Sequence, residues 1–179
     1  MQDNLITKSK YQKSPAGTPY ENSLKELNRL SECDLKVSAF RDVRGGGTGE
    51  EFVENLTKDG DRPGNKWYDG SAGETWIQAD FNTPTRIVFL QLKSANDCPE
   101  RDPYHVTFYV KKNKEEFKKI MTFDNLIWEK RYQLQDFNVD SLEEVDTFKI
   151  VIHKNRSFAL KNNWESGTQL AQVIFYTHY

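Results

Sequence analysis

The segment Trp76-Ile77-Gln78-Ala79-Asp80-Phe81 and the run Arg86–Lys93 that follows it decide the fold class. Both are short, and both are rich in the β-branched and aromatic residues that favour β-strands. The turn residues Asn82-Thr83-Pro84 separate them, and no helical pattern lies between them. Consecutive strands without an intervening helix are typical of antiparallel β-structure, because a parallel sheet needs long crossover connections.

The same pattern recurs along most of the chain. From Asp34 onward, Leu35, Val37 and Ala39 alternate with polar residues, which indicates a strand with one buried face. Further strand-like runs are predicted at His105–Lys112, Phe117–Phe123, Arg131–Val139, Thr147–His153 and Gln169–Thr177. Eight strands with no helices between them predict an all-β, antiparallel, jelly-roll-like β-sandwich over residues 34–179.

The N-terminal part of the chain has a different pattern. Residues 1–17 are polar and without periodicity, which predicts a tail. Thr18-Pro19-Tyr20-Glu21 combines an N-cap Thr, a Pro at the first helical position and a Glu three residues after the cap. With the leucines that follow at a spacing of three, this predicts a short N-terminal helix over residues 18–33. Because such a helix is marginal alone, we expect it to dock on the main body or on a partner.

Composition limits the classes of function. The 179 residues carry 25 Lys and Arg against 27 Asp and Glu, a formal net charge of −2, which argues against a nucleic-acid partner. The 11 Phe, 8 Tyr and 4 Trp are more large rings than disordered chains carry, so they predict a folded aromatic core. No stretch approaches the ~20 apolar residues of a membrane span.

Two further features concern the cellular compartment. The first eight residues lack the apolar run of a signal peptide, which predicts an intracellular protein, or an extracellular one if a native signal peptide has been removed. Cys33 and Cys98 have no metal-ligand spacing, and two unpaired thiols are the expected state.

No motif in the sequence predicts catalysis. The stretch Arg44-Gly45-Gly46-Gly47-Thr48-Gly49 lacks the Gly-Lys-Ser/Thr ending of a phosphate-binding loop. His105, His153 and His178 are isolated in the sequence, without a ligand or catalytic partner at a typical spacing. We therefore predict that the protein is not an enzyme.

The segment from Glu54 to Trp67 is the strongest candidate for a metal site. Asp59, Asp61 and Asn65 place three oxygen-bearing side chains in one tight loop with Gly and Pro. Hard cations such as Ca²⁺ take 6–8 oxygen ligands, and carbonyls of such a loop can join them. The alternative is a pair of Asx-turns closing a loop that Trp67 holds against the core.

The order of motifs resembles the discoidin, or coagulation factor type C, family of galactose-binding-like β-sandwiches. The resemblance covers Asp34 to Tyr176 and rests on five segments: the Gly-rich loop before Glu54-Asn55-Leu56, Asp59-Gly60-Asp61 with Lys66-Trp67, Trp76–Phe81 with Ile87–Leu92, Ser94–Pro103, and Thr168–Tyr176.

The resemblance implies a non-catalytic module that holds a structural Ca²⁺. The implied ligands are the carbonyl near Leu56 with the side chains of Asp59, Asp61, Asn65 and Gln172. Gln172 departs from the family, which commonly has Glu at this position. Because a neutral amide replaces a carboxylate there, the attraction for a divalent cation is weaker.

The resemblance also implies that loops at one end of the sandwich present the ligand site. Sugar recognition needs aromatic platforms and planar hydrogen-bonding groups, and we expect Trp67 and Trp76 to lie in the core instead. For Arg101 and Asp102, bracing of a loop is the alternative role. The candidates are Arg44, Tyr68, Asn96, Asp97, Glu100, Arg101, Tyr104 and Trp164.

Two hypotheses for the function follow. The first is an intracellular, non-catalytic subunit that docks within a larger protein assembly through its arm, residues 1–33. Because the family includes subunits of ciliary transport assemblies, a ciliary or cytoskeletal scaffold is its more specific form. The second is a Ca²⁺-dependent, lectin-like glycan-binding module of a surface or secreted protein.

Overall fold

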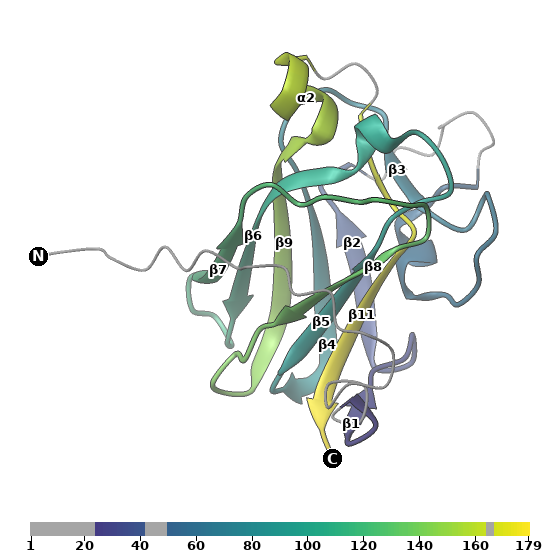
Figure 1. The fold of residues 1–179 in the computed structure, drawn as a ribbon. Helices are drawn as coiled ribbons and strands as arrows, with labels where there is room; N and C mark the ends of the chain where they lie inside the picture. The colour runs from purple at the N-terminus through teal and green to yellow at the C-terminus, as the bar shows by residue number, and fades with distance from the viewer. Residues whose placement is uncertain (1–23, 42–49, 164–166) are drawn as a thin grey trace, which may run out of the picture.

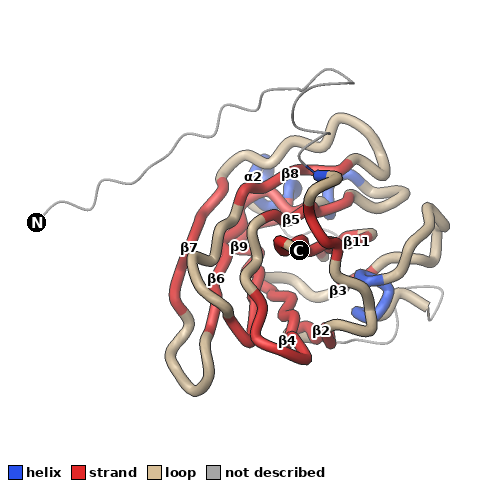
Figure 2. The backbone as a smooth tube through the Cα atoms, turned by 90° about the horizontal axis from the view of Figure 1, so that it is seen from below, coloured by secondary structure: helices blue, strands red, loops and turns tan. Residues whose placement is uncertain are grey.

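The computed structural model describes residues 24–41, 50–163 and 167–179, and two antiparallel sheets form a β-sandwich (Figure 1). The four-stranded sheet has the order β1 (Leu27–Arg29), β11 (Gln172–His178), β5 (Phe89–Lys93), β8 (Leu134–Asn138). The five-stranded sheet has the order β2 (Leu35–Ala39), β4 (Thr75–Thr85), β9 (Val145–Asn155), β6 (Pro103–Lys111), β7 (Lys118–Phe123). Figure 2 shows the two sheets as separate layers.

Smaller elements close the ends of the sandwich. A two-stranded ribbon pairs β3 (Trp67–Asp69) with β10 (Thr168–Leu170). The short helices are η1 (Val53–Thr57), η2 (Pro99–Arg101) and α2 (Arg156–Lys161). Among the described residues, no helix is both long and apolar enough to cross a membrane.

The core between the sheets is aromatic, as the composition predicts. Phe108, Phe137, Phe148 and Phe175 are fully buried, and Trp67 lies with them. The rings meet edge to face, with 5.2 Å between the centroids of Phe108 and Phe137 and 5.3 Å between those of Phe148 and Phe175. Such pairs add to the stability that burial alone gives. The predicted all-β, antiparallel sandwich is therefore confirmed.

Trp76 does not lie in the core, so that prediction is wrong. Its neighbours in the chain, Thr75 and Ile77, are buried, and alternation along β4 turns the indole of Trp76 to the outer face of the five-stranded sheet. There the Nζ of Lys149 lies 4.3 Å from the centre of the indole ring, and Phe40 packs at 6.0 Å between ring centroids. Trp76 is half-buried as a result.

The predicted strand Gln169–Thr177 is two strands. The chain leaves the ribbon after β10 and joins the four-stranded sheet as β11, with Ala171 between the two. The Ala171 N–H donates to the carbonyl of Lys93 at 2.9 Å, which ties this crossing to β5. Three-residue strands such as β3 and β10 are too short for a periodic pattern to indicate them.

The predicted N-terminal helix does not extend over 18–33. Leu24 is helical, but Leu27–Arg29 form β1, with Leu27 opposite His178 and Arg29 opposite Tyr176. Pairing with β11 gives these backbone groups partners, whereas a short helix with one apolar stripe gains little by itself. The sandwich therefore begins before the predicted boundary at 34. Residues 1–23, which include the predicted tail, lie outside the described residues.

Candidate functional site

A buried lysine organises the loops at the end of the sandwich that carries η2 and the ribbon. Lys66 directly precedes β3, and its side chain is 3% exposed. Its Nζ lies 2.7 Å from Asp97 Oδ1, 3.2 Å from Glu51 Oε1 and 3.2 Å from Gln169 Oε1. A buried ammonium needs such partners, because the charge loses its hydration there.

Gln169 extends this network to the backbone. Its Nε2 donates to the carbonyl of Asp97 at 2.6 Å and to that of Cys98 at 3.2 Å, so β10 holds the loop before η2. Burial opposes ionisation of Asp97, but Lys66, Gln169 and Arg101 together outweigh it, and the pKa of Asp97 lies below its usual value. Asp97 is thus an anion, and its side chain remains 44% exposed.

Arg101 and Tyr68 form a stacked pair beside this anion. The guanidinium carbon of Arg101, on η2, lies 4.6 Å from the centre of the Tyr68 ring, on β3. Both residues are half-buried, and so is Glu100 in the same turn of η2. We call the residues Tyr68, Asp97, Glu100 and Arg101 the Tyr68–Arg101 surface.

Asp102 has the bracing role that the sequence suggested for both Arg101 and Asp102. It is fully buried, and Arg131 contacts both its carboxylate oxygens, with Nη1 to Oδ1 at 2.9 Å and Nη2 to Oδ2 at 2.5 Å. Arg131 also donates to the carbonyl of Asp97 at 3.1 Å. The two neighbours therefore separate, Asp102 holding the loop and Arg101 facing Tyr68.

The remaining sequence candidates fall into three groups. Asn96 adjoins the surface, and its side-chain oxygen is buried without a hydrogen-bond partner among the described residues. Tyr104 is half-buried in β6, where its carbonyl accepts from the N–H of Leu126 at 3.0 Å. Arg44 and Trp164 lie outside the described residues. Lys66 and Gln169 lie in segments that carry the family resemblance, but the sequence assigns neither of them a role at the site.

Two of the three histidines that are isolated in the sequence meet in the fold. His105 on β6 and His153 on β9 pack with 4.8 Å between ring centroids. The Nδ1 of His153 lies 2.5 Å from Glu74 Oε2, and that of His105 lies 3.2 Å from Asp124 Oδ1. Mainly because of burial, the pKa of His105 lies below its usual value.

The predicted metal ligands lie in and around the acidic loop, residues 58–65. The Asp59 carboxylate accepts from Arg29 Nη2 at 2.5 Å and from Gln172 Nε2 at 2.9 Å. Gln172 Nε2 also donates to the carbonyl of Lys58 at 3.0 Å. The hydrogen bonds from Arg29 and Gln172 hold the pKa of Asp59 below its usual value, and burial opposes them only in part.

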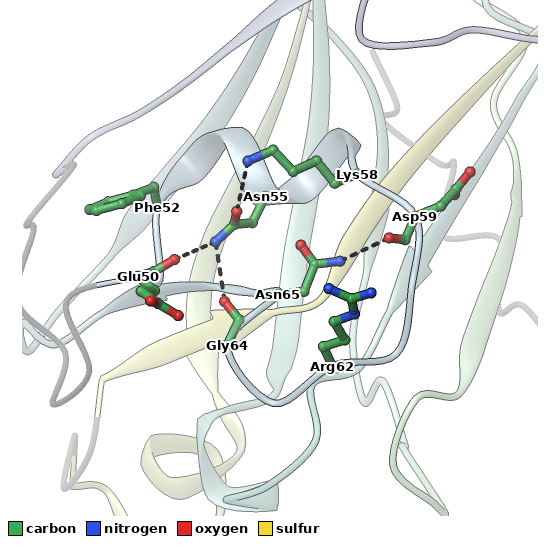
Figure 3. A pocket seen from close by; sticks show the side chains of 8 residues that line it. All are labelled: Glu50, Phe52, Asn55, Lys58, Asp59, Arg62, Gly64 and Asn65. Atoms are coloured by element: carbon green, nitrogen blue, oxygen red, sulfur yellow. Dashed lines mark hydrogen bonds between the residues drawn. The ribbon is translucent and has the colours of Figure 1, made fainter.

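The rest of the acidic loop is also internally bonded. The Asn65 Nδ2 donates to the carbonyls of Gly60 at 2.9 Å and Asp59 at 3.3 Å, and Figure 3 shows this amide turned toward Asp59. Asp61 forms an ion pair with Lys93. An open pocket of about 520 Å³ lies against the loop, with Phe52 and Arg62 in its lining.

This arrangement does not fit a calcium ion. A Ca²⁺ site needs 6–8 oxygens with lone pairs directed at the ion. Here amide N–H groups bond to the carbonyls of residues 58–60, and Arg29 and Lys93 pair with the carboxylates of Asp59 and Asp61. Leu56, whose carbonyl the resemblance implies as a ligand, lies in η1 with its side chain fully buried. The alternative from the sequence, a closed loop next to a core Trp67, describes the observed geometry better.

Comparisons of the sequence with family models and with curated proteins find no match. Comparison of the structure finds many. CpGH89CBM32-5 from Clostridium perfringens, in complex with GalNAc-β-1,3-galactose, matches with a TM-score of 0.64 and 12% identity, over 84% of this chain and 99% of that one.

Two other solved structures show the same likeness. The F5/8 type C domain of a Bacteroides fragilis protein matches with a TM-score of 0.63 and 17% identity, over 86% of this chain and 97% of that one. An F-lectin from striped bass, Morone saxatilis, matches with a TM-score of 0.60 and 10% identity, over 82% of this chain and 46% of that one. The chain therefore has the galactose-binding-like β-sandwich fold of family 32 carbohydrate-binding modules, F5/8 type C domains and F-lectins.

Proposed function

We propose that this chain is a non-catalytic glycan-binding module whose ligand contacts the Tyr68–Arg101 surface. The observation that carries the proposal is the stack of Arg101 on Tyr68 beside the exposed carboxylate of Asp97. Structural neighbours solved in complex with GalNAc-β-1,3-galactose and with galactose support a sugar as the ligand class.

The chemistry of the surface suits a saccharide. A sugar ring has an apolar C–H face and a rim of hydroxyl groups, so it needs an aromatic ring together with donors and acceptors. Tyr68 supplies the ring, Arg101 supplies planar N–H donors, and the carboxylates of Asp97 and Glu100 accept hydrogen bonds from hydroxyls. Lys66 bonds to the carboxylate of Asp97 and Gln169 bonds to its carbonyl. The Asp97 carboxylate is therefore fixed in position before a ligand binds.

The test is a glycan array with the full chain, followed by calorimetry on the sugars that bind. Tyr68→Ala and Arg101→Ala are each expected to weaken binding at least tenfold, because each removes one side of the stacked pair. Arg86→Ala is the matched control, since Arg86 forms an exposed pair with Asp140 elsewhere. A silent array, or unchanged affinity in both variants, would contradict the proposal.

Docking within a protein assembly receives less support. That hypothesis draws on the arm over residues 1–33, of which residues 1–23 lie outside the described residues. None of the structural neighbours cited above adds support for a ciliary or cytoskeletal role. We therefore keep the glycan hypothesis. Because the acidic loop does not fit a calcium ion, binding of the glycan is proposed to be independent of Ca²⁺.

A further inference from the structure

The acidic loop carries two carboxylates, and each is neutralised by a cation from a different strand. Arg29 reaches Asp59 from β1, with Nη2 2.5 Å from Oδ1 and Nη1 3.4 Å from Oδ2. Lys93 reaches Asp61 from β5. Both cations therefore anchor the loop to the four-stranded sheet.

The position of Arg29 follows from the register of β1. Arg29 pairs with Tyr176, and Leu30 continues the ladder through its N–H to the carbonyl of Phe175 at 2.9 Å. A small pocket of about 350 Å³ is lined by Arg29 and the residues after it on one side and by Lys58 and Asp59 on the other. The register of β1 thus places the guanidinium of Arg29 next to the acidic loop.

The side-chain amides of Gln172 and Asn65 also bond to the acidic loop. Gln172 on β11 and Asn65 within the loop each donate two hydrogen bonds into it, chiefly to the carbonyls of residues 58–60. A cation entering the loop would have to displace these N–H groups from the oxygens. It would also meet the charges of Arg29 and Lys93 at close range, where repulsion is strong.

We propose that Arg29 and Lys93 are built-in counter-ions that replace a divalent cation in this loop, so that the loop keeps its conformation without Ca²⁺. Together with the two amides, they carry out the two tasks of such an ion, which are to neutralise the carboxylates and to gather the loop oxygens. The proposal does not depend on which ligand the Tyr68–Arg101 surface binds.

The first experiment measures the thermal unfolding of the full chain in millimolar Ca²⁺ and in EDTA. The expected result is the same Tm in both, because a ligand that binds only the folded state must raise its stability. A Tm that rises with Ca²⁺ in the natural chain, and no longer rises in Asp59→Asn, would overturn the proposal.

The second experiment restores the requirement for a metal. The triple variant Arg29→Gln, Lys93→Gln, Gln172→Glu removes both cations and adds a carboxylate. Its Tm is expected to rise by roughly 5–10 °C when Ca²⁺ reaches about 100 times Kd. Tb³⁺ luminescence sensitised by the protein's aromatic rings gives an independent readout of binding.

Two further variants separate the contributions. Gln172→Glu alone should gain no response to Ca²⁺, because Arg29 and Lys93 remain; a full response from this variant would show that the cations do not exclude the metal. Arg86→Gln removes an exposed pair with Asp140, in which no residue of the acidic loop takes part, and should also gain none. A triple variant that folds but binds neither Ca²⁺ nor Tb³⁺ would equally overturn the proposal.

Discussion

Two clusters in this molecule pair basic side chains with carboxylates, and they differ mainly in their exposure. At the Lys66 cluster, the side chain of Lys66 is 3% exposed, and those of its partners Glu51 and Asp97 are 11% and 44% exposed. At the acidic loop, Arg29 and Asp59 are 40% and 74% exposed, and both are open to water. The chemical groups are alike, but the surrounding medium is not.

The difference determines what each cluster contributes. Breaking a buried pair leaves a charge without hydration or partner, which typically costs about 3–5 kcal/mol. An exposed pair contributes roughly 0.2–1 kcal/mol, because water and salt screen the attraction. We therefore expect the Lys66 cluster to contribute strongly to the stability of the loops around it. The ion pairs of the acidic loop should contribute only a little to stability.

The largest effect is expected from Lys66→Met. The substitution leaves Glu51 and Asp97 beside an apolar side chain, and we expect the free energy of unfolding to fall by about 3 kcal/mol or more. Urea unfolding followed by tryptophan fluorescence measures it, and the exposed Lys119→Met serves as the control. A loss below about 1 kcal/mol would remove the contrast between the two clusters.

A smaller effect is expected from Arg29→Gln. Because the pair with Asp59 is exposed, the loss should stay below about 1 kcal/mol and shrink as NaCl screens the charges. Comparing urea unfolding of the natural chain and the variant at low and high salt measures both features. A large loss that does not depend on salt would place the acidic loop in the same class as Lys66.

The smallest effect concerns His105, which is only partly exposed. Burial lowers its pKa below 6.5, although Asp124 raises it. The unfolded chain therefore binds more protons, so the free energy of unfolding falls as the pH drops through 6.5 toward the folded pKa. In His105→Gln this part of the decline should be absent. Stability curves between about pH 5 and pH 8 test it, and equal slopes for both proteins would contradict it.

The sandwich could be predicted from the sequence because its strands carry their own signals. Alternation at Leu35, Val37 and Ala39 and the apolar run around Leu90 mark one buried face and one buried strand, respectively. The N-terminal leucines led to a wrong prediction. Their spacing of three is typical of a helix, but Leu27–Arg29 form a strand because they pair with β11, about 150 residues away in the chain. The sequence pattern around the leucines carries no information about this distant partner.

The candidate site was predictable only in part, for a similar reason. Tyr68, Asp97 and Arg101 have the residue types that bind sugars, and the fold brings them together. Lys66 and Gln169, which position Asp97, are 103 residues apart in the chain, so the local sequence around either one does not show that they meet. For the acidic loop, Gln172 in place of Glu already indicates in the sequence that a metal fits poorly, but the cations are visible only in three dimensions.

The pairing of β1 with β11 also lowers the tendency of the protein to self-associate. Without β1, the outer N–H and C=O groups at the Phe175–His178 end of β11 would lose their partners, and an unpaired strand at the edge of a sheet is a template for association with another chain. A fragment that starts at residue 34 would lose this cover. We expect such a fragment to self-associate through β11, a result that light scattering would reveal, whereas a fragment that keeps Leu27–Arg29 retains its protected edge.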